Sequence, residues 1–495
     1  MSDGAIVGEF DTVLDLFDEV IERAPDVEAF IERSPERRSI TFVEWAAAAD
    51  GLAQHLIDEG VEPGDVVSIR LPSGIDYAIA YQAVLRAGAV ATGVNPRLGT
   101  AEVEHIHALT CPTYVFDGPL PQFASGDPRR RHVTHAGTDP VAIVWTGGTT
   151  GVPKGAWFDH HCLRSMALGG APLSQPGDRR LSPLPFAHVG AMTRVWDELA
   201  NVVTTVITPT PWTPEATLDL LVSEAVTVCQ GVPTQYRMLL DLPELDHADL
   251  SALRLAGTGA ARVPAELVAE MRERLGCPVV VRYASTESCL ATGTRVDDDI
   301  TTICTTVGRP NGDVELRLVS PDRTVIADTG PDHVGRVQLR SRAMMRGYWN
   351  DPERTAAAIT PDGWLDTGDL GWLGDDGNLR LTGRESEMYI RGGYNVYPIE
   401  VENCLGAHDG VLAGAVVGAD VDDRLGEIGV LFAVASPGSS LDLHDVRAFV
   451  KGHLADYKAP DVLVVVDELP VTPIGKIDKK ALQSRADEEA RRWTR

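Results

Sequence analysis

Apolar residues recur every three or four positions in two early stretches of the chain. These stretches are FVEWAAAADGLAQHLIDEG (residues 42–60) and AIAYQAVLRAG (residues 78–88), and their spacing predicts amphipathic helices. Short apolar runs predict buried strands in GDVVSIRL, AVATGV and PTYVFDG (residues 64–71, 89–94 and 112–118). The alternation of helix and strand predicts an α/β fold.

The pattern changes in the last third of the chain. From about Gly335, short strands with tight turns replace the alternation, and Asp376-Gly377 suits a β-hairpin. A small α+β unit is predicted by VLAGAVVGAD, EIGVLFAVAS and the helical LHDVRAFVKGHLAD (residues 411–420, 427–436 and 443–456). We therefore expect two domains. The first is a large N-terminal domain of α/β sheets with a small β-rich subdomain (residues 1–384), and the second is a small mobile α+β C-terminal domain (residues 385–495).

Composition indicates which binding partners and which cellular compartment are expected for this chain. The 495 residues include 44 basic and 72 acidic side chains, a net charge of −28, which argues against a nucleic-acid or anionic-membrane binder. The seven cysteines contain no C-x-x-C pair, so free thiols in a reducing compartment are expected. The acidic N-terminus lacks a basic leader, and no apolar stretch approaches the roughly 18 residues of a membrane span. We expect a cytoplasmic protein.

A loop rich in glycine and threonine follows a predicted strand. The strand is PVAIVW (residues 140–145), and TGGTTGVPKG (residues 146–155) comes directly after Trp145. Free backbone amides, hydroxyls and a lysine are what a polyphosphate needs. The segment contains neither G-x-x-x-x-G-K-[ST] nor G-x-G-x-x-G, which disfavours a P-loop NTPase and a Rossmann enzyme. The residues alone leave a phosphate loop and a flexible turn both open.

Six further segments share a fixed order with this loop. Taken alone each has an ordinary interpretation: His188 as a structural histidine, Tyr283 and Glu287 as one face of a helix, Lys476 as a solvated lysine. Together with the loop, the set resembles the signatures of the adenylate-forming superfamily of acyl-CoA synthetases, peptide adenylation domains and luciferases. The resemblance runs from about residue 30 to 485, and its segments are PLPFAHVGAM (183–192), GTGAAR (257–262), RYASTES (282–288), GWLDTGDLGWL (363–373), TGRESEMYIRGGYNVYPIEVE (382–402) and LPVTPIGKIDKKAL (469–482).

The resemblance implies a set of nucleotide contacts. Glu287 would ligate Mg²⁺ and Thr286 would bind the α-phosphate, while Asp369 and Arg384 would contact the ribose. The β and γ phosphates of ATP would bind Thr146, Gly147, Gly148, Thr149, Thr150, Gly151 and Lys154, and adenine would lie against Gly259, Ala260, Ala261 and Tyr283.

The resemblance also implies the groups that serve the acid and the thiol. Lys476 would be the mobile catalytic lysine, Ser386 the hinge, and Gly392 and Gly393 the border of the tunnel for coenzyme A. With Lys476, the residues expected to act in catalysis are His188, Thr286 and Glu287. The expected substrate pocket comprises His188, Val189, Gly190, Ala191, Gly257, Ala284 and Ser285.

These expectations amount to an ATP-, Mg²⁺- and CoA-dependent ligase of a small carboxylic acid. The apolar pocket residues suit a hydrophobic acid without a second charge. Their small side chains leave room for a bulky alicyclic, steroid or terpenoid skeleton, and a medium or aromatic acid is left open. No nucleic-acid partner is expected, and a homodimer is left open.

Four departures from the family pattern keep alternatives open. Gly147 replaces a serine, Ala284 a glycine and Ser386 an aspartate or lysine, and Arg336 stands where Gly-Glu is usual. The alternatives are a synthetase that adenylates weakly and uses a supplied acyl-adenylate, an adenylation enzyme that loads a carrier protein, and a degenerate nucleotide-binding protein.

Overall fold

The computed structural model describes residues 5–6, 8–33, 36–147, 153–169, 173–259, 261, 263–331, 333–422, 426–471 and 477–493. The chain divides into two compact units. Unit 1 comprises residues 1–316 and 339–365, and unit 2 comprises residues 317–338 and 366–495.

Unit 1 contains two large sheets and most of the helices. Its helices are α1 (Val13–Arg23), α2 (Phe42–Asp58), α3 (Ile75–Arg86), α4 (Thr100–Thr110), α5 (His160–Gly169), α6 (Val189–Met192), α7 (Val195–Ala200), α8 (Pro214–Ser223), α9 (Pro233–Leu240), the 3₁₀ helix η1 (Pro243–His247), α10 (Ala265–Leu275), α11 (Ile300–Thr305) and α12 (Pro352–Ala358). The two helices expected from apolar periodicity correspond to α2 and α3, and both predictions are confirmed.

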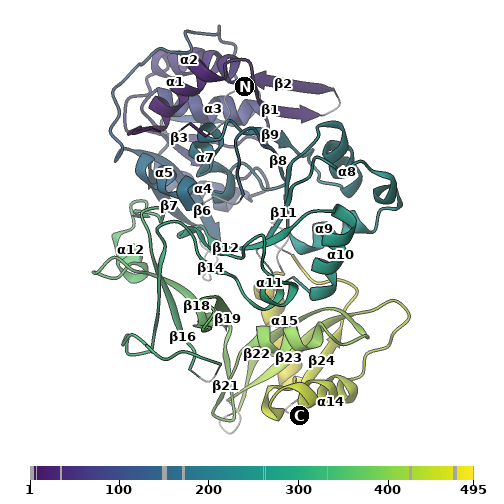
Figure 1. Ribbon diagram of the computed structural model, residues 1–495. Helices are drawn as coiled ribbons and strands as arrows, with labels where there is room; N and C mark the ends of the chain where they lie inside the picture. Colours follow the sequence, from purple (N-terminus) through teal and green to yellow (C-terminus); the bar gives the residue numbers. More distant parts are fainter. Residues whose placement is uncertain are drawn as a thin grey trace. The chain divides into compact units, whose positions relative to one another are not determined.

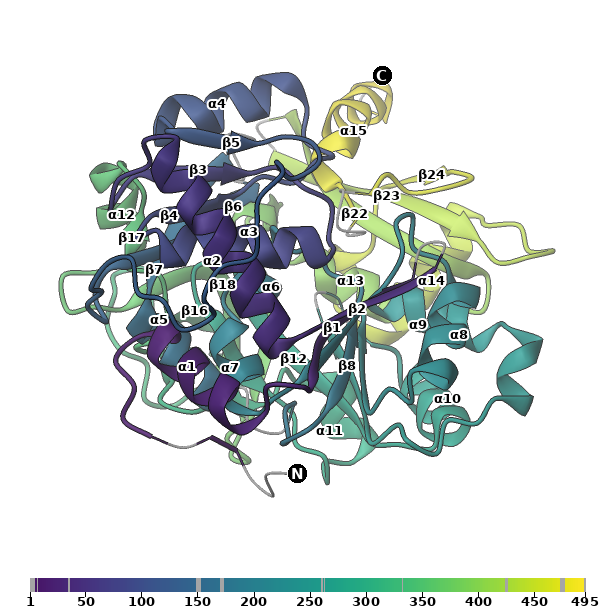
Figure 2. The same cartoon turned by 90° about the horizontal axis from the view of Figure 1, so that it is seen from above.

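The first sheet of unit 1 has nine strands in the order β14-β13-β12-β11-β10-β8-β9-β1-β2. These are β1 (Glu28–Arg33), β2 (Arg37–Thr41), β8 (Arg179–Ser182), β9 (Thr204–Ile207), β10 (Val228–Gly231), β11 (Leu255–Gly259), β12 (Val279–Ser285), β13 (Cys289–Gly293) and β14 (Arg309–Pro310). The central strands run parallel, and β12, β13 and β14 pair antiparallel at one edge. Helices α8, α9 and α10 gather beside this sheet in both Figure 1 and Figure 2, and their leucines join its buried core.

The second sheet has six strands in the order β17-β7-β6-β4-β3-β5. These are β3 (Val66–Ile69), β4 (Val90–Gly93), β5 (Tyr114–Phe116), β6 (Pro140–Gly147), β7 (Pro153–Asp159) and β17 (Gly347–Tyr348). Strands β3, β4 and β5 match the three expected apolar runs. Strands β3 and β4 are fully buried and therefore read as continuous apolar segments, whereas Val115 of the edge strand β5 is exposed.

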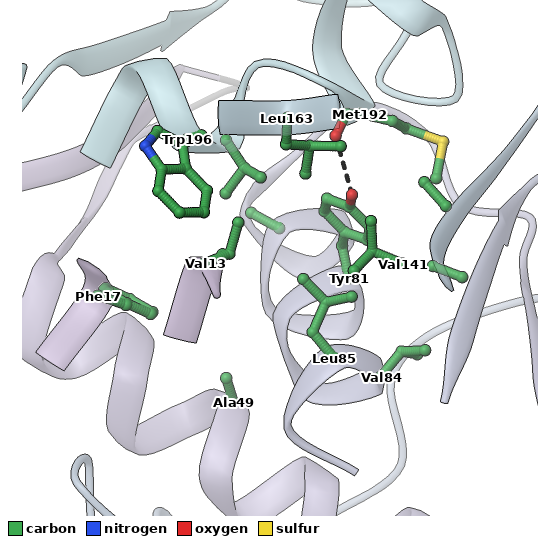
Figure 3. Packing of buried hydrophobic residues seen from close by; sticks show 14 of the residues in the cluster. Val13, Phe17, Ala49, Tyr81, Val84, Leu85, Val141, Leu163, Met192 and Trp196 are labelled. Atoms are coloured by element: carbon green, nitrogen blue, oxygen red, sulfur yellow. Dashed lines mark hydrogen bonds between the residues drawn. The ribbon is translucent and has the colours of Figure 1, made fainter. Parts of the chain in front are cut away.

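The packed interior of unit 1 also positions a segment of the candidate site. Figure 3 shows Tyr81 of α3 donating a hydrogen bond to the backbone oxygen of Met192, the last residue of α6, at 2.8 Å. Both residues are almost fully buried, and burial raises the pKa of Tyr81. The contact ties α6, which His188 begins, to the hydrophobic core.

Unit 2 is built on two smaller sheets. One has the order β15-β16-β18-β19, with β15 (Glu315–Val319), β16 (Gly335–Arg340), β18 (Leu365–Leu373) and β19 (Leu379–Arg384). The other has the order β21-β20-β23-β22, with β24 beside β23; its strands are β20 (Tyr389–Arg391), β21 (Tyr394–Val396), β22 (Val411–Asp422), β23 (Gly426–Ala435) and β24 (Val462–Val465). The helices are η2 (Glu385–Glu387), α13 (Pro398–Leu405), α14 (Leu443–His453), η3 (Asp456–Lys458) and α15 (Lys479–Trp493). The expected hairpin at Asp376-Gly377 joins β18 to β19, and Gly377 has φ +72° there.

Candidate functional site

The segment RYASTES forms the end of β12 and the turn that leads into β13. The two strands pair antiparallel, with a register shift between Tyr283 and Ala284. Ser285 and Ser288 close the turn: the backbone N–H of Ser288 donates to Ser285 Oγ at 3.0 Å, and that of Ser285 donates to Ser288 Oγ at 3.2 Å. The turn presents Thr286 and Glu287 at the end of the sheet, half-buried. The alternative interpretation of Tyr283 and Glu287 as one face of a helix is wrong.

Glu287 has a partner that lies outside the sequence motifs. The phenol of Tyr348 in β17 donates a hydrogen bond to Glu287 Oε1 at 2.9 Å. Burial, followed by the adjacent Glu287 charge, raises the pKa of Tyr348, so the phenol stays protonated as a donor. The backbone N–H of Met345 donates to the Glu287 carbonyl at 2.8 Å. No short motif marks Tyr348; its pairing opposite Ala156 of β7 brings it to the site.

The Glu287 carboxylate fits a magnesium ligand. One oxygen is held by Tyr348, and none of the described residues donates to the other. An oriented carboxylate with one open oxygen is the kind of ligand that a hard divalent cation prefers. Bound there, Mg²⁺ would supply positive charge to neutralise phosphate oxygens.

The glycine-rich loop joins two antiparallel strands. Thr146 lies opposite Lys154, and Gly147 lies opposite Pro153, at the paired ends of β6 and β7. The P-loop and the Rossmann fingerprint both lead from a strand into a helix, so this hairpin agrees with the exclusion of both from the sequence. The Lys154 ammonium lies 5.3 Å from the centre of the Tyr348 ring, which brings one end of the loop close to the partner of Glu287. Gly148, Thr149, Thr150 and Gly151 lie outside the described residues.

The two glycines of β11, Gly257 and Gly259, differ in whether the surrounding protein requires glycine. Gly259 pairs with Arg282, and a Cβ at position 259 would lie 2.5 Å from the Arg282 carbonyl oxygen, so the neighbouring strand itself requires glycine. At Gly257 the nearest atom to a Cβ would be a Leu173 methyl at 3.6 Å, an ordinary contact. The neighbouring protein atoms therefore do not require glycine at position 257. The absence of a side chain there is compatible with a surface that binds a ligand. Ala261 is exposed, and Ala260 lies outside the described residues.

His188 has a local role that the structure makes plain. It is the N-cap of α6, and its Nδ1 accepts a hydrogen bond from the backbone N–H of Gly190 at 3.1 Å. The cap sets the ring's orientation at the start of the segment that carries Val189, Gly190 and Ala191. Ala284 is exposed and Ser285 half-buried, both beside the β12–β13 turn.

Within unit 2, the two expected ribose residues lie side by side. Asp369 in β18 pairs with Arg384 in β19, and Arg384 Nε donates to Asp369 Oδ1 at 3.0 Å. The Asp369 side chain is nearly buried, whereas Arg384 is exposed. The arginine thus holds the carboxylate in place at the surface end of the strand pair.

The expected hinge lies between two ion-paired residues. Ser386 is exposed in η2, between Glu385 and Glu387. Arg336 pairs with Glu385, which accounts for one departure from the family pattern. Lys479 contacts Glu387 at 2.8 Å and Glu402 at 2.9 Å.

The other site residues expected in unit 2 are the two glycines of the coenzyme A tunnel and the catalytic lysine. Gly392 and Gly393 form the two-residue turn between β20 and β21, with φ of +58° and +85°. Such turns need left-handed backbone at both positions, which favours glycine. Lys476 lies outside the described residues.

Comparison with known proteins gives the same assignment as the motifs. The AMP-binding enzyme family matches residues 17–349, and the AMP-binding enzyme C-terminal domain matches residues 400–476. A 3-[(3aS,4S,7aS)-7a-methyl-1,5-dioxo-octahydro-1H-inden-4-yl]propanoyl:CoA ligase of Mycobacterium tuberculosis is 36% identical, over 97% of this chain and 99% of that protein. An indoleacetate–CoA ligase of Aromatoleum aromaticum is 32% identical, over 90% of this chain and 94% of that protein.

A solved structure supports the fold. ATP-bound MatB from Rhodopseudomonas palustris is 26% identical with a TM-score of 0.87, covering 97% of this chain and 100% of that chain. In the part of the chain that the structure describes, no helix has the length and apolar character needed to cross a membrane. The chain belongs to the AMP-binding enzyme family, within the acyl-CoA synthetase branch of the adenylate-forming superfamily.

Proposed function

We propose that this chain is an acyl-CoA ligase for a bulky alicyclic carboxylic acid, with a fused-ring propanoic acid as the leading substrate class. The reaction uses ATP, Mg²⁺ and coenzyme A. The carboxylate attacks the α-phosphorus of ATP, pyrophosphate leaves, and the thiol then displaces AMP from the acyl-adenylate.

The observation that carries this proposal is the full-length similarity to a ligase of a bicyclic dioxo-indenyl propanoic acid. That relative is 36% identical and aligns with 97% of this chain. A second ligase of the same acid, from Rhodococcus jostii, is 33% identical over 90% of this chain. Two relatives with one bulky substrate favour a pocket for an alicyclic acid here.

We assign the roles in unit 1 by the chemistry of each group. Tyr348 holds one oxygen of Glu287, so that the other would be available to bind Mg²⁺, and Thr286 would donate to the α-phosphate. Lys154 and the loop from Thr146 bind the outer phosphates. The pocket for the acid is built from the α6 segment and from Gly257, with His188 between the acid and the route of the thiol.

In unit 2 we assign Asp369 and Arg384 to the ribose, because their ion pair presents oxygen and nitrogen at one strand end. Lys476 stabilises the charge that develops at the α-phosphorus. Movement at Ser386 exchanges Lys476 for the Gly392-Gly393 turn, so residues 385–495 act as the mobile domain. The similarity to relatives that are named CoA ligases favours coenzyme A over a carrier protein as the acceptor.

The test is a substrate panel with the purified protein. ATP, Mg²⁺ and coenzyme A are supplied with the dioxo-indenyl propanoic acid, indoleacetic acid, ferulic acid and a long-chain fatty acid, and thioesters are measured by mass spectrometry. The proposal predicts the highest kcat/KM for the bicyclic acid. A higher value for a planar aromatic or linear acid would overturn the alicyclic assignment. Release of pyrophosphate without any thioester would overturn coenzyme A as the acceptor.

A further inference from the structure

A half-buried arginine lies on the strand face that carries Gly257 and Gly259. Arg282 precedes Tyr283 in β12 and pairs with Gly259 of β11. Two residues earlier, Val280 pairs with Gly257. Residues two apart in a strand, and residues paired across strands, share one face of a sheet. The Arg282 side chain therefore leaves the sheet on the same face as Gly257, where a Cβ would make only ordinary contacts.

The hydrogen bonding of Arg282 is incomplete. Nη1 donates to Asn311 Oδ1 at 3.3 Å, an oxygen that also accepts from Arg295 at 2.9 Å. Nε and Nη2 are buried and make no hydrogen bond to any residue that the structure describes. Among the described residues, no carboxylate forms an ion pair with Arg282. The neighbouring strand makes space for this side chain, because a Cβ at Gly293 would overlap its guanidinium.

A buried carboxylate in this region serves other arginines. Asp197 Oδ2 accepts from Arg180 at 3.0 Å and from Arg194 at 3.2 Å, and all three side chains are buried. Burial first, and then the nearby positive charges of Arg295 and Arg194, lower the pKa of Arg282 to about 10. Glu198 lies 3.6 Å from Arg180, so two carboxylates balance Arg180 and Arg194, and Arg282 is left without one among the described residues.

The two unsatisfied donors form one edge of the guanidinium. Nε–H and Nη2–H point in the same direction and make the planar fork that arginine uses to bind oxygen acceptors. Leaving both unpaired inside a protein is unfavourable, and a ligand oxygen would satisfy them. Arg282 as a whole is only half-buried, and a side-chain rotation would be needed to present this edge to a ligand. Val280, on the same sheet face, packs with Leu173 and Leu290 in a buried apolar cluster, so the wall beside Arg282 is hydrocarbon.

We propose that Arg282 determines specificity by donating its Nε–Nη2 edge to an oxygen acceptor on the ring system of the acid, remote from the carboxylate that reacts. The acceptor is a ring carbonyl or a second carboxylate. This inference deepens the proposed function and rests on it. It also revises the expectation of a purely hydrophobic acid, because a guanidinium with two buried donors would face the ring system.

The experiment compares three acids on one bicyclic skeleton: one with ring carbonyls, one with methylenes in their place, and one with an added ring carboxylate. The wild type is expected to prefer an oxygen-bearing acid over the methylene acid by about 10- to 100-fold in kcat/KM, the range of a hydrogen bond to a charged group. Arg282→Met should remove this preference while changing kcat/KM for the methylene acid by less than about threefold. The oxygen-bearing acid that is preferred identifies the acceptor.

Arg295→Met is the matched control. It removes a second arginine that also binds Asn311, but its donors are paired, with Nη2 on the Pro310 carbonyl at 3.2 Å. This variant should keep the preference. If Arg282→Met does not fold, Arg282→Lys is the variant to measure. Lysine keeps the positive charge but lacks the planar pair of N–H donors, so the preference for the oxygen-bearing acid should fall by about tenfold.

Equal loss on all three acids in Arg282→Met would overturn the inference and leave the ligase intact as a function. The inference is also overturned if the wild type shows no preference among the three acids. If the wild type converts none of them but forms another acyl-CoA, the alicyclic assignment falls and this inference falls with it.

Discussion

The phenol of Tyr348 donates a 2.9 Å hydrogen bond to Glu287, a residue 61 positions earlier in the chain. The contact joins β17, at the edge of the six-stranded sheet, to the turn at the end of β12 in the nine-stranded sheet. The candidate magnesium ligand is therefore held between the two sheets of unit 1, and its orientation depends on both.

Replacing Tyr348 with phenylalanine should weaken the use of Mg²⁺. Without the phenol the Glu287 carboxylate loses a hydrogen bond worth about 1.5–3 kcal/mol, so the Mg²⁺ concentration for half-maximal adenylation should rise about tenfold. The measurement is pyrophosphate exchange against Mg²⁺ concentration. Tyr114→Phe is the control, since Tyr114 also bonds one side chain, His55, at 3.3 Å. An unchanged Mg²⁺ dependence in Tyr348→Phe would contradict the role of Tyr348 in holding Glu287 as a Mg²⁺ ligand.

Lys476→Ala should separate the two half-reactions. Removal of a dominant charge-stabilising group costs about 3 kcal/mol or more, so adenylation should fall by several powers of ten. Thioester formation from a synthetic acyl-adenylate should remain near the wild-type rate. Lys480→Ala, at an exposed lysine of α15, should affect neither step. Equal loss of both steps in Lys476→Ala would show that the lysine is not specific to adenylation.

Bulk at Gly393 should block the thiol rather than the nucleotide. Gly393 has φ +85°, and a Cβ at this position would have no atom within 4 Å, so leucine adds both strain and volume. Gly393→Asn is the control, because asparagine tolerates left-handed backbone. It separates the effect of added side-chain volume from that of a strained turn. Gly393→Leu should slow thioester formation and leave ATP–pyrophosphate exchange near wild type. Loss of exchange would mean that the turn does not border the tunnel.

The phosphate loop can be tested through ligands that differ in phosphate number. Thr149→Ala with Thr150→Ala should raise the KM for ATP, because each lost charge-assisted hydrogen bond is worth roughly 1.5–3 kcal/mol. Affinity for an acyl-adenylate, which lacks the β and γ phosphates, should stay within a few fold. Gly147→Ser restores the hydroxyl that the family pattern contains, and it should speed adenylation. Equal loss of ATP and acyl-adenylate binding in the double variant would make the loop a structural turn.

Acid should destabilise the fold through His160. Its Nδ1 accepts a hydrogen bond from the backbone N–H of Val13 at 3.2 Å, and burial lowers its pKa from 6.5 to about 4. As the pH falls below 6.5, His160 therefore becomes protonated in the unfolded state while it stays neutral in the folded state. The free energy of unfolding consequently decreases between pH 6.5 and 4. The loss should reach about 3 kcal/mol at about 1.4 kcal/mol per pH unit.

Denaturant unfolding across that pH range measures the effect. His160→Asn keeps an acceptor near the Nδ1 position without a titrating ring, so its stability should depend less on pH than that of the wild type. His161→Asn, at an exposed histidine paired with Asp11, should follow the wild type. Parallel curves for wild type and His160→Asn would rule out His160 as the source.

Sequence patterns within one segment predict the helices and hairpins whose conformation depends mainly on that segment's own residues. Helix α2 was predicted because its buried face recurs with helical spacing, and the β18–β19 hairpin because glycine suits the φ of +72° at Gly377. Tyr348 could not be predicted, because its role depends on β17 pairing with β7, about 190 residues earlier in the chain. Arg282 is only the first letter of a motif in the sequence, since the lack of a carboxylate beside it is a property of the folded chain.

The central claim is that the acid is activated by direct attack of its carboxylate on the α-phosphorus of ATP. The most direct measurement supplies the bicyclic acid with oxygen-18 in its carboxylate, together with ATP, Mg²⁺ and coenzyme A, and analyses the products by mass spectrometry. The account predicts one labelled oxygen in each AMP and none in pyrophosphate, with one thioester formed per AMP. Label in inorganic phosphate, with ADP as the nucleotide product, would contradict it.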